Sequence, residues 1–462
     1  MSLDTRNAGS RVAFLAIAAG GLLGFAYTLS PLTVLCLPVI GLLALRVGRD
    51  LGQRERQWFF ALVIVAIVLR LSAIAGLFLW ADDAQPYATF FGDEQLFKNR
   101  SMWMRNIGMG MPISPADIIY AVDDVGESSY LYVLAILQAL VGAAPYGVHV
   151  LNTTFYAAAV LVLYRLVRPA FGGVASLAGL GLLLFLPSLF VWSISALKEP
   201  LYTLVAVGEL WCALYVIRGK TWGRRVAAAA GLVVGALALD SVRRGGLSVA
   251  VLGAAGGLVL GVAVAGPRLL LAMAVTTPVI AALALSTPAV QERLLHLGRM
   301  SANYHIGHVV SLGYSYRLIE PRYYREIGGA VRMPPREVAA YAVKSVASYV
   351  VQPLPWKAES RAMLAYLPEQ MLWLIVVALV PIGILAGLRR DPLLASLLAA
   401  HAGAVMMMVA LTSGNIGTLI RHRGLALPYL AWLAGLGVCE FVRVMTAAPS
   451  PFSRSRSSHG HR

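Results

Sequence analysis

Charged residues are scarce in this sequence. They make up 13% of its 462 residues, whereas a soluble globular chain carries about 25%. Hydrophobic residues make up 59%, and the mean hydropathy is +0.73. This balance excludes an ordinary soluble enzyme. It also argues against a nucleic-acid-binding protein, because the chain has no basic soluble domain to hold the nucleic acid.

Cysteine and lysine are rare as well. Cys36, Cys212 and Cys439 each stand alone in an apolar run, so we expect packing residues rather than disulfides or a thiolate metal site. Five lysines stand against 33 arginines, and the net charge is +16. Two explanations of the arginines stay open: the basic cytoplasmic loops of membrane proteins, and phosphate recognition by the planar guanidinium fork.

Long apolar runs are abundant. A membrane-spanning helix needs about 20 mostly apolar residues, and such runs must be helical because lipid offers the backbone no hydrogen-bond partner. We therefore expect an all-α, polytopic membrane protein with about twelve transmembrane helices. The first run is expected to stay as a helix and not to be cleaved as a signal peptide. The expected spans are 12–29, 31–46, 57–80, 147–164, 174–195, 200–217, 225–240, 247–265, 268–287, 367–388, 392–412 and 424–443.

Basic loops between these runs fall on one side, which puts the N-terminus in the cytoplasm. The segment 130–143 is short for a span, and we expect it to lie on the outer surface or only to dip into the membrane. The expected organisation is an N-terminal hairpin with a cytoplasmic loop (1–56), a transmembrane core (57–217) that holds a first outer loop (81–146), further transmembrane helices (218–287), a second large outer loop (288–366), C-terminal transmembrane helices (367–445) and a disordered basic tail (446–462).

Four polar clusters reach the outer face in this topology: Asp93–Glu94, Lys198–Glu199, Arg243–Arg244 and Arg421–His422–Arg423. Each has an ordinary explanation by itself. An acid near a helix end can be a solvated cap, arginines at the end of a span can be interfacial anchors, and "LKEP" can be a helix start with proline in its first turn. Together they are typical of a site that moves a sugar from a polyprenyl phosphate or diphosphate.

In such a site each cluster has a role. Asp93, with Glu94 beside it, is the candidate general base on an acceptor hydroxyl or the ligand of a divalent cation such as Mg or Mn. The candidate substrate-binding residues hold the lipid phosphate and stabilise its leaving charge; they are Lys198, Glu199, Arg243, Arg244, Arg421, His422 and Arg423. Aromatic residues near Asp93 can stack on a sugar or prenyl chain, or form an interfacial belt; they are Trp80, Tyr87, Phe90, Phe91 and Trp103.

The order of these features resembles the GT-C superfamily of polyprenyl-phosphate-dependent glycosyltransferases, in particular the protein-mannosyltransferase and aminoarabinose-transferase type (family 39-like). The resemblance covers roughly residues 57–217. It rests on "GDEQLF" after an exiting helix and on the long stretch from "ESSYLYVLAILQALVGAAPYG" to "FVWSISALKEPLY". Beyond residue 217 only the general plan matches, with "SGNIGTLIRHR" similar to a stretch of exopolysaccharide-associated membrane proteins.

The resemblance implies an inverting glycosyltransferase of the bacterial inner membrane, with its active site on the extracytoplasmic face. It carries the family's first-loop catalytic or metal-binding acid over to Asp93, and its donor-pocket acid over to Glu199. The expected partners are a polyprenyl-phosphate sugar donor, a lipid, glycan or protein acceptor, and membrane lipids. The sequence departs from the family at "GESSYLY" (126–132), where Glu127 stands near the place of a Pro-Pro pair. It also has an extra N-terminal hairpin and no large soluble C-terminal domain, so protein N-glycosylation is not expected.

Two other functions stay open. An O-antigen-type polymerase or ligase would use arginines of the 288–366 loop, at Arg317, Arg322 or Arg325, and would leave "GDE" without a role. A polysaccharide or lipid transporter would need ionisable residues at mid-membrane, where Asp240 and Glu209 are the nearest candidates.

Overall fold

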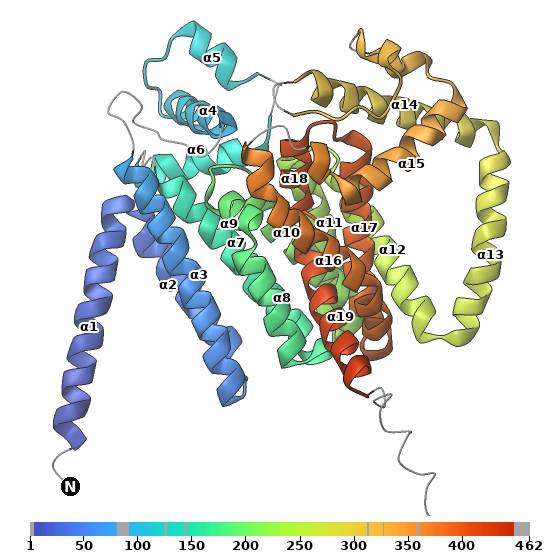
Figure 1. Cartoon of the computed structure of the whole chain (residues 1–462). Coiled ribbons are helices and arrows are strands. Elements are labelled where there is room, and N and C mark those ends of the chain that lie inside the picture. The colour runs from blue at the N-terminus through green and yellow to red at the C-terminus, as the bar shows by residue number, and fades with distance from the viewer. Residues whose placement is uncertain are drawn as a thin grey trace, which may run out of the picture. The chain divides into compact units, whose positions relative to one another are not determined.

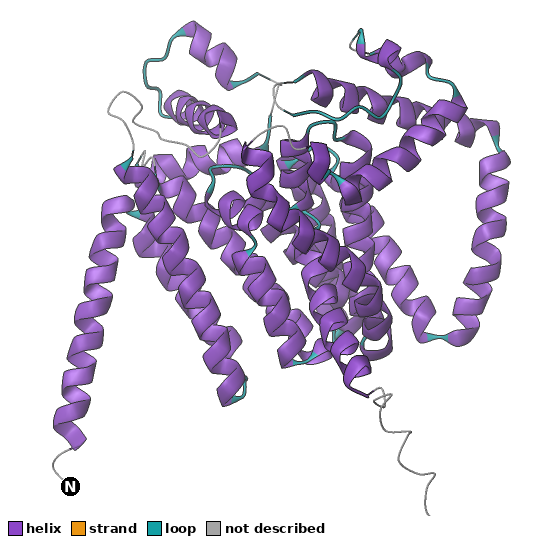
Figure 2. Ribbon diagram, viewed as in Figure 1, coloured by secondary structure: helices purple, strands orange, loops and turns teal. Residues whose placement is uncertain are grey.

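A computed structural model gives the fold of the chain (Figures 1 and 2). It describes residues 4–80, 92–123, 127–142, 146–311, 314–326, 328–357 and 361–447. Over these residues the chain is helical and has no β-strand apart from one isolated bridge between Ser315 and Asn415. The expectation of an all-α, polytopic membrane protein is confirmed.

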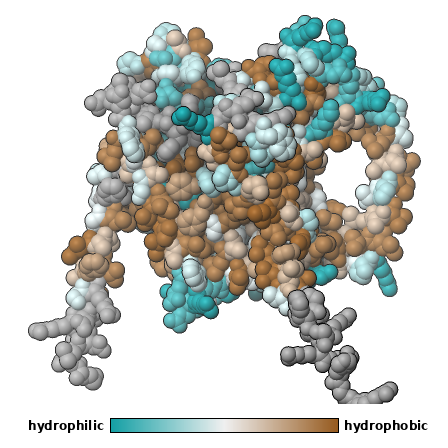
Figure 3. Space-filling model, viewed as in Figure 1, coloured by the Kyte–Doolittle hydropathy of each residue, from teal (hydrophilic) through white to brown (hydrophobic). Residues whose placement is uncertain are grey.

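Nine of the described helices are long and apolar enough to cross a membrane, or up to ten if two helices joined at a bend form one span. Hydrophobic side chains cover the lengths of the helices in Figure 3, and hydrophilic ones gather at their ends. The nine are α3 (Gln53–Leu79), α7 (Gly147–Phe171), α10 (Glu199–Arg218), α11 (Trp222–Val242), α12 (Gly246–Ala265), α13 (Pro267–Ser286), α16 (Arg361–Arg390), α17 (Pro392–Thr412) and α19 (Leu427–Ala447).

The difference from twelve predicted spans lies near the N-terminus. The described residues of α1 (Asp4–Leu29) include the apolar stretch Val12–Gly24, and α2 (Leu32–Gly48) has 17 residues; that these two runs cross the membrane stays a prediction. The run predicted as one span over 174–195 is interrupted at Leu186, which is extended. It forms α8 (Gly173–Phe185) and α9 (Pro187–Ile194). Proline at residue 187 explains the break, because it has no N–H to continue α8 and is favoured in the first turn of α9.

The two predicted outer loops contain helices of their own. The first holds α4 (Gly92–Gly108), α5 (Pro115–Ala121) and α6 (Ser129–Val141), while 81–91, 124–126 and 143–145 lie outside the described residues. The second holds α14 (Pro288–Val310), the 3-10 turns η1 (Pro321–Tyr324), η2 (Gly329–Arg332) and η3 (Pro355–Lys357), and α15 (Pro335–Val351). The predicted tail falls mostly on 448–462, which also lie outside the described residues.

The chain divides into two compact units. Unit 1 comprises residues 1–166 and 183–254, and unit 2 comprises 167–182 and 255–462. In unit 1, one hydrophobic core joins α3, α4, α6, α7 and α9 around buried residues such as Ile74, Tyr130 and Leu134. This core packs α3, α7 and α9 against α4 and α6.

In unit 2, α16 and α19 pack at very short range. A Cβ on Gly383 would lie 1.8 Å from the Leu433 carbonyl oxygen, and one on Gly437 would lie 2.3 Å from that of Leu379. Only glycine therefore permits this contact. A second core joins α14 to η1, η2 and α15 around Ala302, Ile306 and Tyr341. The short helix α18 (Ile416–Arg423) begins at Asn415, whose side chain accepts hydrogen bonds from Gly417 and Thr418.

Candidate functional site

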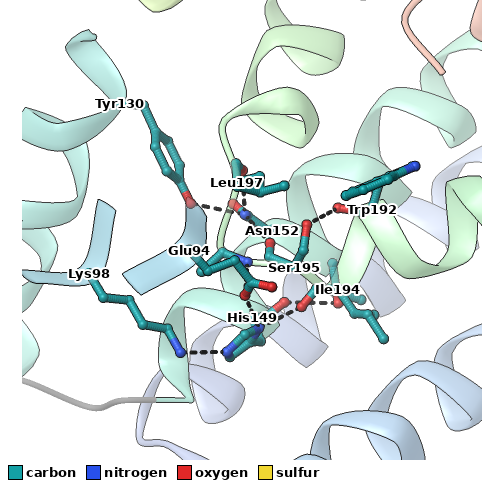
Figure 4. A network of polar contacts seen from close by, with 11 residues as sticks. Glu94, Lys98, Tyr130, His149, Asn152, Trp192, Ile194, Ser195 and Leu197 are labelled. Atoms are coloured by element: carbon teal, nitrogen blue, oxygen red, sulfur yellow. Dashed lines mark hydrogen bonds and ion pairs between the residues drawn. The ribbon is translucent and has the colours of Figure 1, made fainter. Parts of the chain in front are cut away.

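The centre of unit 1 is the segment 193–197, which ends α9 and leads into α10. Side chains from α3, α4 and α7 contact each of its five residues. All of them are buried. Figure 4 shows Glu94, His149 and Asn152 around Ile194, Ser195 and Leu197. Because Lys198 and Glu199 follow directly, these contacts fix where the second predicted polar cluster lies.

Glu94 binds the segment from α4. Its Oε2 accepts a hydrogen bond from the backbone N–H of Ala196 at 2.8 Å, and its side chain is fully enclosed. It lies in the first turn of α4, where the helix dipole favours an acid. One turn later Lys98 projects from the same face of the helix. The sequence predicted a catalytic pair at Asp93 and Glu94, and the structure gives the two carboxylates different surroundings.

His149 connects Lys98 to the segment. Its Nδ1 lies 2.6 Å from the Ile194 carbonyl oxygen, which can only accept, so Nδ1 carries the proton. Nε2 then accepts from the Lys98 ammonium at 2.9 Å, and Glu94 Oε2 lies 3.8 Å from Nδ1. Burial lowers the pKa of Lys98 to about 8, and the charge of Glu94 opposes this shift. A buried lysine that titrates near neutral pH is typical of functional sites.

Asn152 holds two further carbonyl groups of the segment. Its amide nitrogen donates to the oxygens of Ser195 at 2.6 Å and Leu197 at 2.7 Å, and lies 2.9 Å from the hydroxyl of Tyr130. The Tyr130 ring packs edge-on against Phe97 of α4, with centroids 5.6 Å apart. Carbonyl groups in a non-helical stretch at a span end need such donors, because an unpaired buried carbonyl costs about as much as a lost hydrogen bond.

Arg70 supports the start of the segment from the middle of α3. Its Nε donates to the Ser193 hydroxyl at 2.8 Å and its Nη1 to the Ala66 carbonyl at 3.1 Å. Its guanidinium carbon lies 4.9 Å from the centroid of the Phe190 ring and 5.5 Å from that of Tyr156. Within the described part of the chain it forms no ion pair with a carboxylate. The faces of these two aromatic rings therefore offset part of the cost of burying the Arg70 charge.

Buried Glu199 and partly exposed Arg243 form a polar pair next to the segment. Glu199 begins α10, and its Oε1 lies 3.7 Å from an Arg243 guanidinium nitrogen; their side chains are 9% and 18% exposed. Arg243 is the residue that ends α11, and this end is attached to α6 because Ser128 donates to the Val242 carbonyl at 2.6 Å. Arg244 is exposed.

Phe97 of α4 is the neighbour that Lys198 and Asp93 share. The Lys198 ammonium lies 6.0 Å from the centroid of the Phe97 ring. Asp93 is exposed and stands one helical turn before Phe97, so the two project from the same face. The structure thus brings three of the predicted clusters, Asp93–Glu94, Lys198–Glu199 and Arg243–Arg244, to one end of the helices of unit 1.

The fourth predicted cluster belongs to unit 2 and is largely internal. Arg423 is buried and its guanidinium lies between the rings of Tyr349 and Trp373. It donates to the carbonyl oxygens of Tyr349 and Gln352 and to the side chain of Gln370. His422 is buried and Arg421 is partly exposed. A role for Arg421, His422 and Arg423 in the same site as Asp93 stays a prediction.

The remaining predicted features are scattered. Among the described residues, no group of three or more His, Cys, Asp or Glu side chains is arranged to hold a metal ion, so a divalent cation at Asp93 stays a prediction. Trp80 is exposed, Trp103 packs edge-on against Tyr120, and Glu127 is exposed. Tyr87, Phe90 and Phe91 lie outside the described residues.

Four residues around the segment 193–197 were not predicted as site residues, although the sequence pattern marks each of them as unusual. Arg70 stands inside the apolar run 57–80, and an ionisable residue within a span indicates function by default. Lys98 follows Glu94 at helical spacing, and His149 and Asn152 interrupt the apolar run 147–164. Their common partner, the segment 193–197, could not be found from sequence. The chain matches no protein-family model, no curated protein and no solved structure.

Proposed function

We propose that this protein is a membrane glycosyltransferase of the bacterial inner membrane. It takes a sugar from a polyprenyl phosphate or diphosphate donor and gives it to a lipid, glycan or protein acceptor on the extracytoplasmic face. One observation supports this most: exposed Asp93 shares a helix face with Phe97, over which Lys198 lies, and Lys198 is followed by Glu199, which pairs with the partly exposed Arg243. Acid and cations are thus gathered where apolar helices end.

The proposed reaction is a single displacement. Asp93 accepts the proton of the acceptor hydroxyl, whose oxygen attacks the anomeric carbon of the donor. The bond from that carbon to the phosphate oxygen breaks, and the electron pair leaves with the phosphate. Arg243 and Lys198 stabilise the charge that develops on the phosphate. A single displacement inverts the anomeric carbon.

Glu94 has a positioning role in this proposal. A carboxylate that is enclosed and bound to the Ala196 N–H cannot also reach an acceptor hydroxyl. It holds the segment that leads to Lys198 and Glu199, as Asn152 and His149 do from α7. A binding group displaced by about 1 Å can cost about 100-fold in rate, so the segment 193–197 matters although it touches no substrate.

Two arginines of the polymerase or ligase alternative have partners within unit 2. Arg322 pairs with Glu320 at 3.0 Å and Glu337 at 2.7 Å, and its side chain is 55% exposed. Arg317 lies over the Tyr324 ring, with its guanidinium carbon 5.4 Å from the centroid. Arg243 is paired as well, with Glu199, and its side chain is 18% exposed, so the transfer assay distinguishes the two sets of arginines.

A reconstituted assay tests the proposal. The purified protein is placed in lipid vesicles with a panel of polyprenyl-phosphate and polyprenyl-diphosphate sugars, and release of the sugar is measured with and without candidate acceptors. Arg243→Gln should lower the rate with every acceptor, because Arg243 holds the donor, and Arg322→Gln should retain it. If Arg322→Gln abolishes transfer while Arg243→Gln is fully active, the polymerase or ligase assignment replaces this one.

A further inference from the structure

An open groove lies beside the beginning of α3, about 20 Å along that helix from Arg70. We call it the α3 groove. It has a volume of about 640 Å³, and its lining consists of Leu51, Gln53, Arg56, Gln57 and Phe60. Three of these side chains donate hydrogen bonds and two are apolar. The lining therefore suits a ligand that has a polar part and an apolar part.

The α3 groove lies at the depth where lipid headgroups meet acyl chains. Trp58, in the second turn of α3, is 59% exposed, and tryptophan is enriched at the boundary between membrane and water. The apolar run 57–80 begins at the same point of the sequence. In Figure 3, hydrophilic side chains gather at the lower end of this helix. A lipid in the surrounding leaflet can therefore reach the groove with both its headgroup and its chains.

The two acids near the groove are held by α7. Asp50 lies 3.7 Å from a guanidinium nitrogen of Arg165, and Glu55 accepts a hydrogen bond from the hydroxyl of Tyr164 at 2.7 Å. Their carboxylates thus have partners on another helix. These contacts leave the groove itself lined by one cation and no acid.

That cation is Arg56. Its guanidinium carbon lies 5.8 Å from the centroid of the Phe60 ring, and no carboxylate of the described residues forms an ion pair with it. Between residues 46 and 56 four arginines stand against two acids, and three of these arginines are exposed near the groove: Arg46, Arg49 and Arg54. Basic clusters next to a spanning helix attract anionic lipids, so the charge of the groove complements an anionic headgroup.

We propose that the α3 groove binds the phosphodiester headgroup of an anionic phospholipid. The Arg56 guanidinium donates to the phosphate oxygens, and the amides of Gln53 and Gln57 donate to the same headgroup. The first carbons of an acyl chain lie against Phe60, which removes apolar surface from water. This inference does not depend on the proposed function, because the groove requires no sugar donor and none of its residues belongs to the candidate site.

The test measures how lipids stabilise the full-length protein in detergent. A ligand that binds the folded protein raises its unfolding temperature with concentration, and the titration gives an apparent dissociation constant. Phosphatidylglycerol should stabilise the protein. Phosphatidylethanolamine with the same acyl chains should do so far more weakly, because its headgroup has no net charge. Equal stabilisation by the two lipids overturns the inference.

Three variants separate binding in the groove from general attraction to positive charge. Arg56→Gln should raise the apparent dissociation constant of phosphatidylglycerol about fivefold. Arg224→Gln removes the same charge from an exposed arginine of α11 and should leave the constant unchanged. Gln57→Ala removes no charge, yet it should raise the constant about 2- to 10-fold, because a hydrogen bond to the headgroup is lost.

All three side chains are exposed, so each variant should unfold at the temperature of the parent protein when no lipid is added. The inference fails if Arg56→Gln and Arg224→Gln lose affinity equally, which would indicate general attraction between charges. It also fails if Gln57→Ala binds phosphatidylglycerol as the parent protein does.

Two further measurements exclude other occupants of the α3 groove. Inorganic phosphate in large excess should not displace phosphatidylglycerol; if it does, the ligand is a free anion and not a lipid. Light scattering should give the same mass for the parent protein and for Arg56→Gln. A parent dimer that dissociates in Arg56→Gln would assign the groove to a second copy of the chain and overturn the inference.

Discussion

The carboxylate of Glu94 accepts the backbone N–H of Ala196 at 2.8 Å, across a sequence separation of 102 residues. This contact joins the predicted cluster Asp93–Glu94 to the segment 193–197, which comes directly before the predicted cluster Lys198–Glu199. It makes Glu94 part of the support of the site, while its neighbour Asp93 stays exposed. Adjacent acids that looked equivalent in the sequence therefore have different expected phenotypes.

Substitution of Glu94 should affect stability in a graded way. Glu94→Gln keeps an oxygen that can accept from Ala196 but loses the charge beside Lys98, so its cost should be intermediate. Glu94→Ala should lower the free energy of unfolding by about 2–4 kcal/mol, because it leaves a buried N–H and a buried cation without their partner. Thermal unfolding in detergent measures both, with Gln95→Ala, an exposed neighbour, as control. An Ala variant as stable as the control would contradict the contact.

Asn152 offers a test in which shape is conserved and hydrogen bonding is reversed. Asn152→Asp keeps the size of the side chain, but an ionised carboxylate can only accept, and it would face the carbonyl oxygens of Ser195 and Leu197. We expect Asp to be more damaging than Ala, with a loss above about 3 kcal/mol or failure to fold. Thr154→Val, two residues further along α7, is the control. Equal stability of the Asp and Ala variants would show that the two carbonyls do not depend on Asn152.

Arg70 should not be replaceable by lysine. A lysine has no planar fork to reach both Ser193 and Ala66, and it cannot lie flat against Phe190. Arg70→Lys should lower stability by about 1–3 kcal/mol and slow sugar release, since the end of α9 moves. The measurement is unfolding together with transfer rate. The positioning role fails if Arg70→Lys is fully active and stable.

His305 in unit 2 predicts a pH dependence of stability. Its Nδ1 lies 2.7 Å from the Ser413 carbonyl, its Nε2 lies 3.0 Å from the Tyr324 hydroxyl, and the rings of Tyr316 and Tyr341 surround it. Burial, and to a lesser extent the charge of His308, lower the pKa of His305 to about 4. The unfolded chain, with a histidine pKa of about 6.5, binds the proton more tightly, so stability is lost as pH falls from 6.5 toward 4.

At pH 5 this loss should be about 2 kcal/mol relative to pH 7. His305→Asn retains a donor for the Ser413 carbonyl and removes the titrating group, so it should flatten the dependence. His296→Asn, an exposed histidine on the same helix, should leave it unchanged. The measurement is the unfolding temperature between pH 4.5 and 7.5. If the unfolding temperature of His305→Asn falls with pH as steeply as that of the parent protein, His305 is excluded as the source of the pH dependence.

The spanning helices were predictable because lipid imposes one solution on an apolar run of sufficient length. The spans expected over 12–29 and 31–46 correspond to α1 and α2, and their crossing of the membrane stays a prediction. The apolar segment expected over 130–143 corresponds to α6. The expectation was incomplete for 92–121 and 288–366, which looked like loops because their helices are rich in polar residues and mixed with Pro and Gly. Helical spacing within "GDEQLFKNRSMW" would have placed Glu94 and Lys98 on one face.

The sequence identifies the polar clusters of the candidate site, but it does not show which side chains contact one another. Charge at span ends identified Asp93, Glu199 and Arg243, since a polar group in an apolar chain is costly and therefore conspicuous. No pattern in the sequence shows that Arg70, Glu94, His149 and Asn152 meet on the five consecutive residues 193–197. Such contacts depend on packing between distant helices, and hydropathy carries no information about it.

The measurement that tests the central claim most directly is the rate of sugar release from a polyprenyl-phosphate sugar by purified Asp93→Asn in lipid vesicles. Asparagine preserves size and cannot take the proton of the acceptor, and an exposed side chain contributes little to stability. We expect the rate to fall about 10²- to 10⁴-fold with the unfolding temperature unchanged and with Gln95→Ala fully active. A folded Asp93→Asn that transfers sugar at the rate of the parent protein would contradict the assignment of Asp93 as the base, and with it the proposed site.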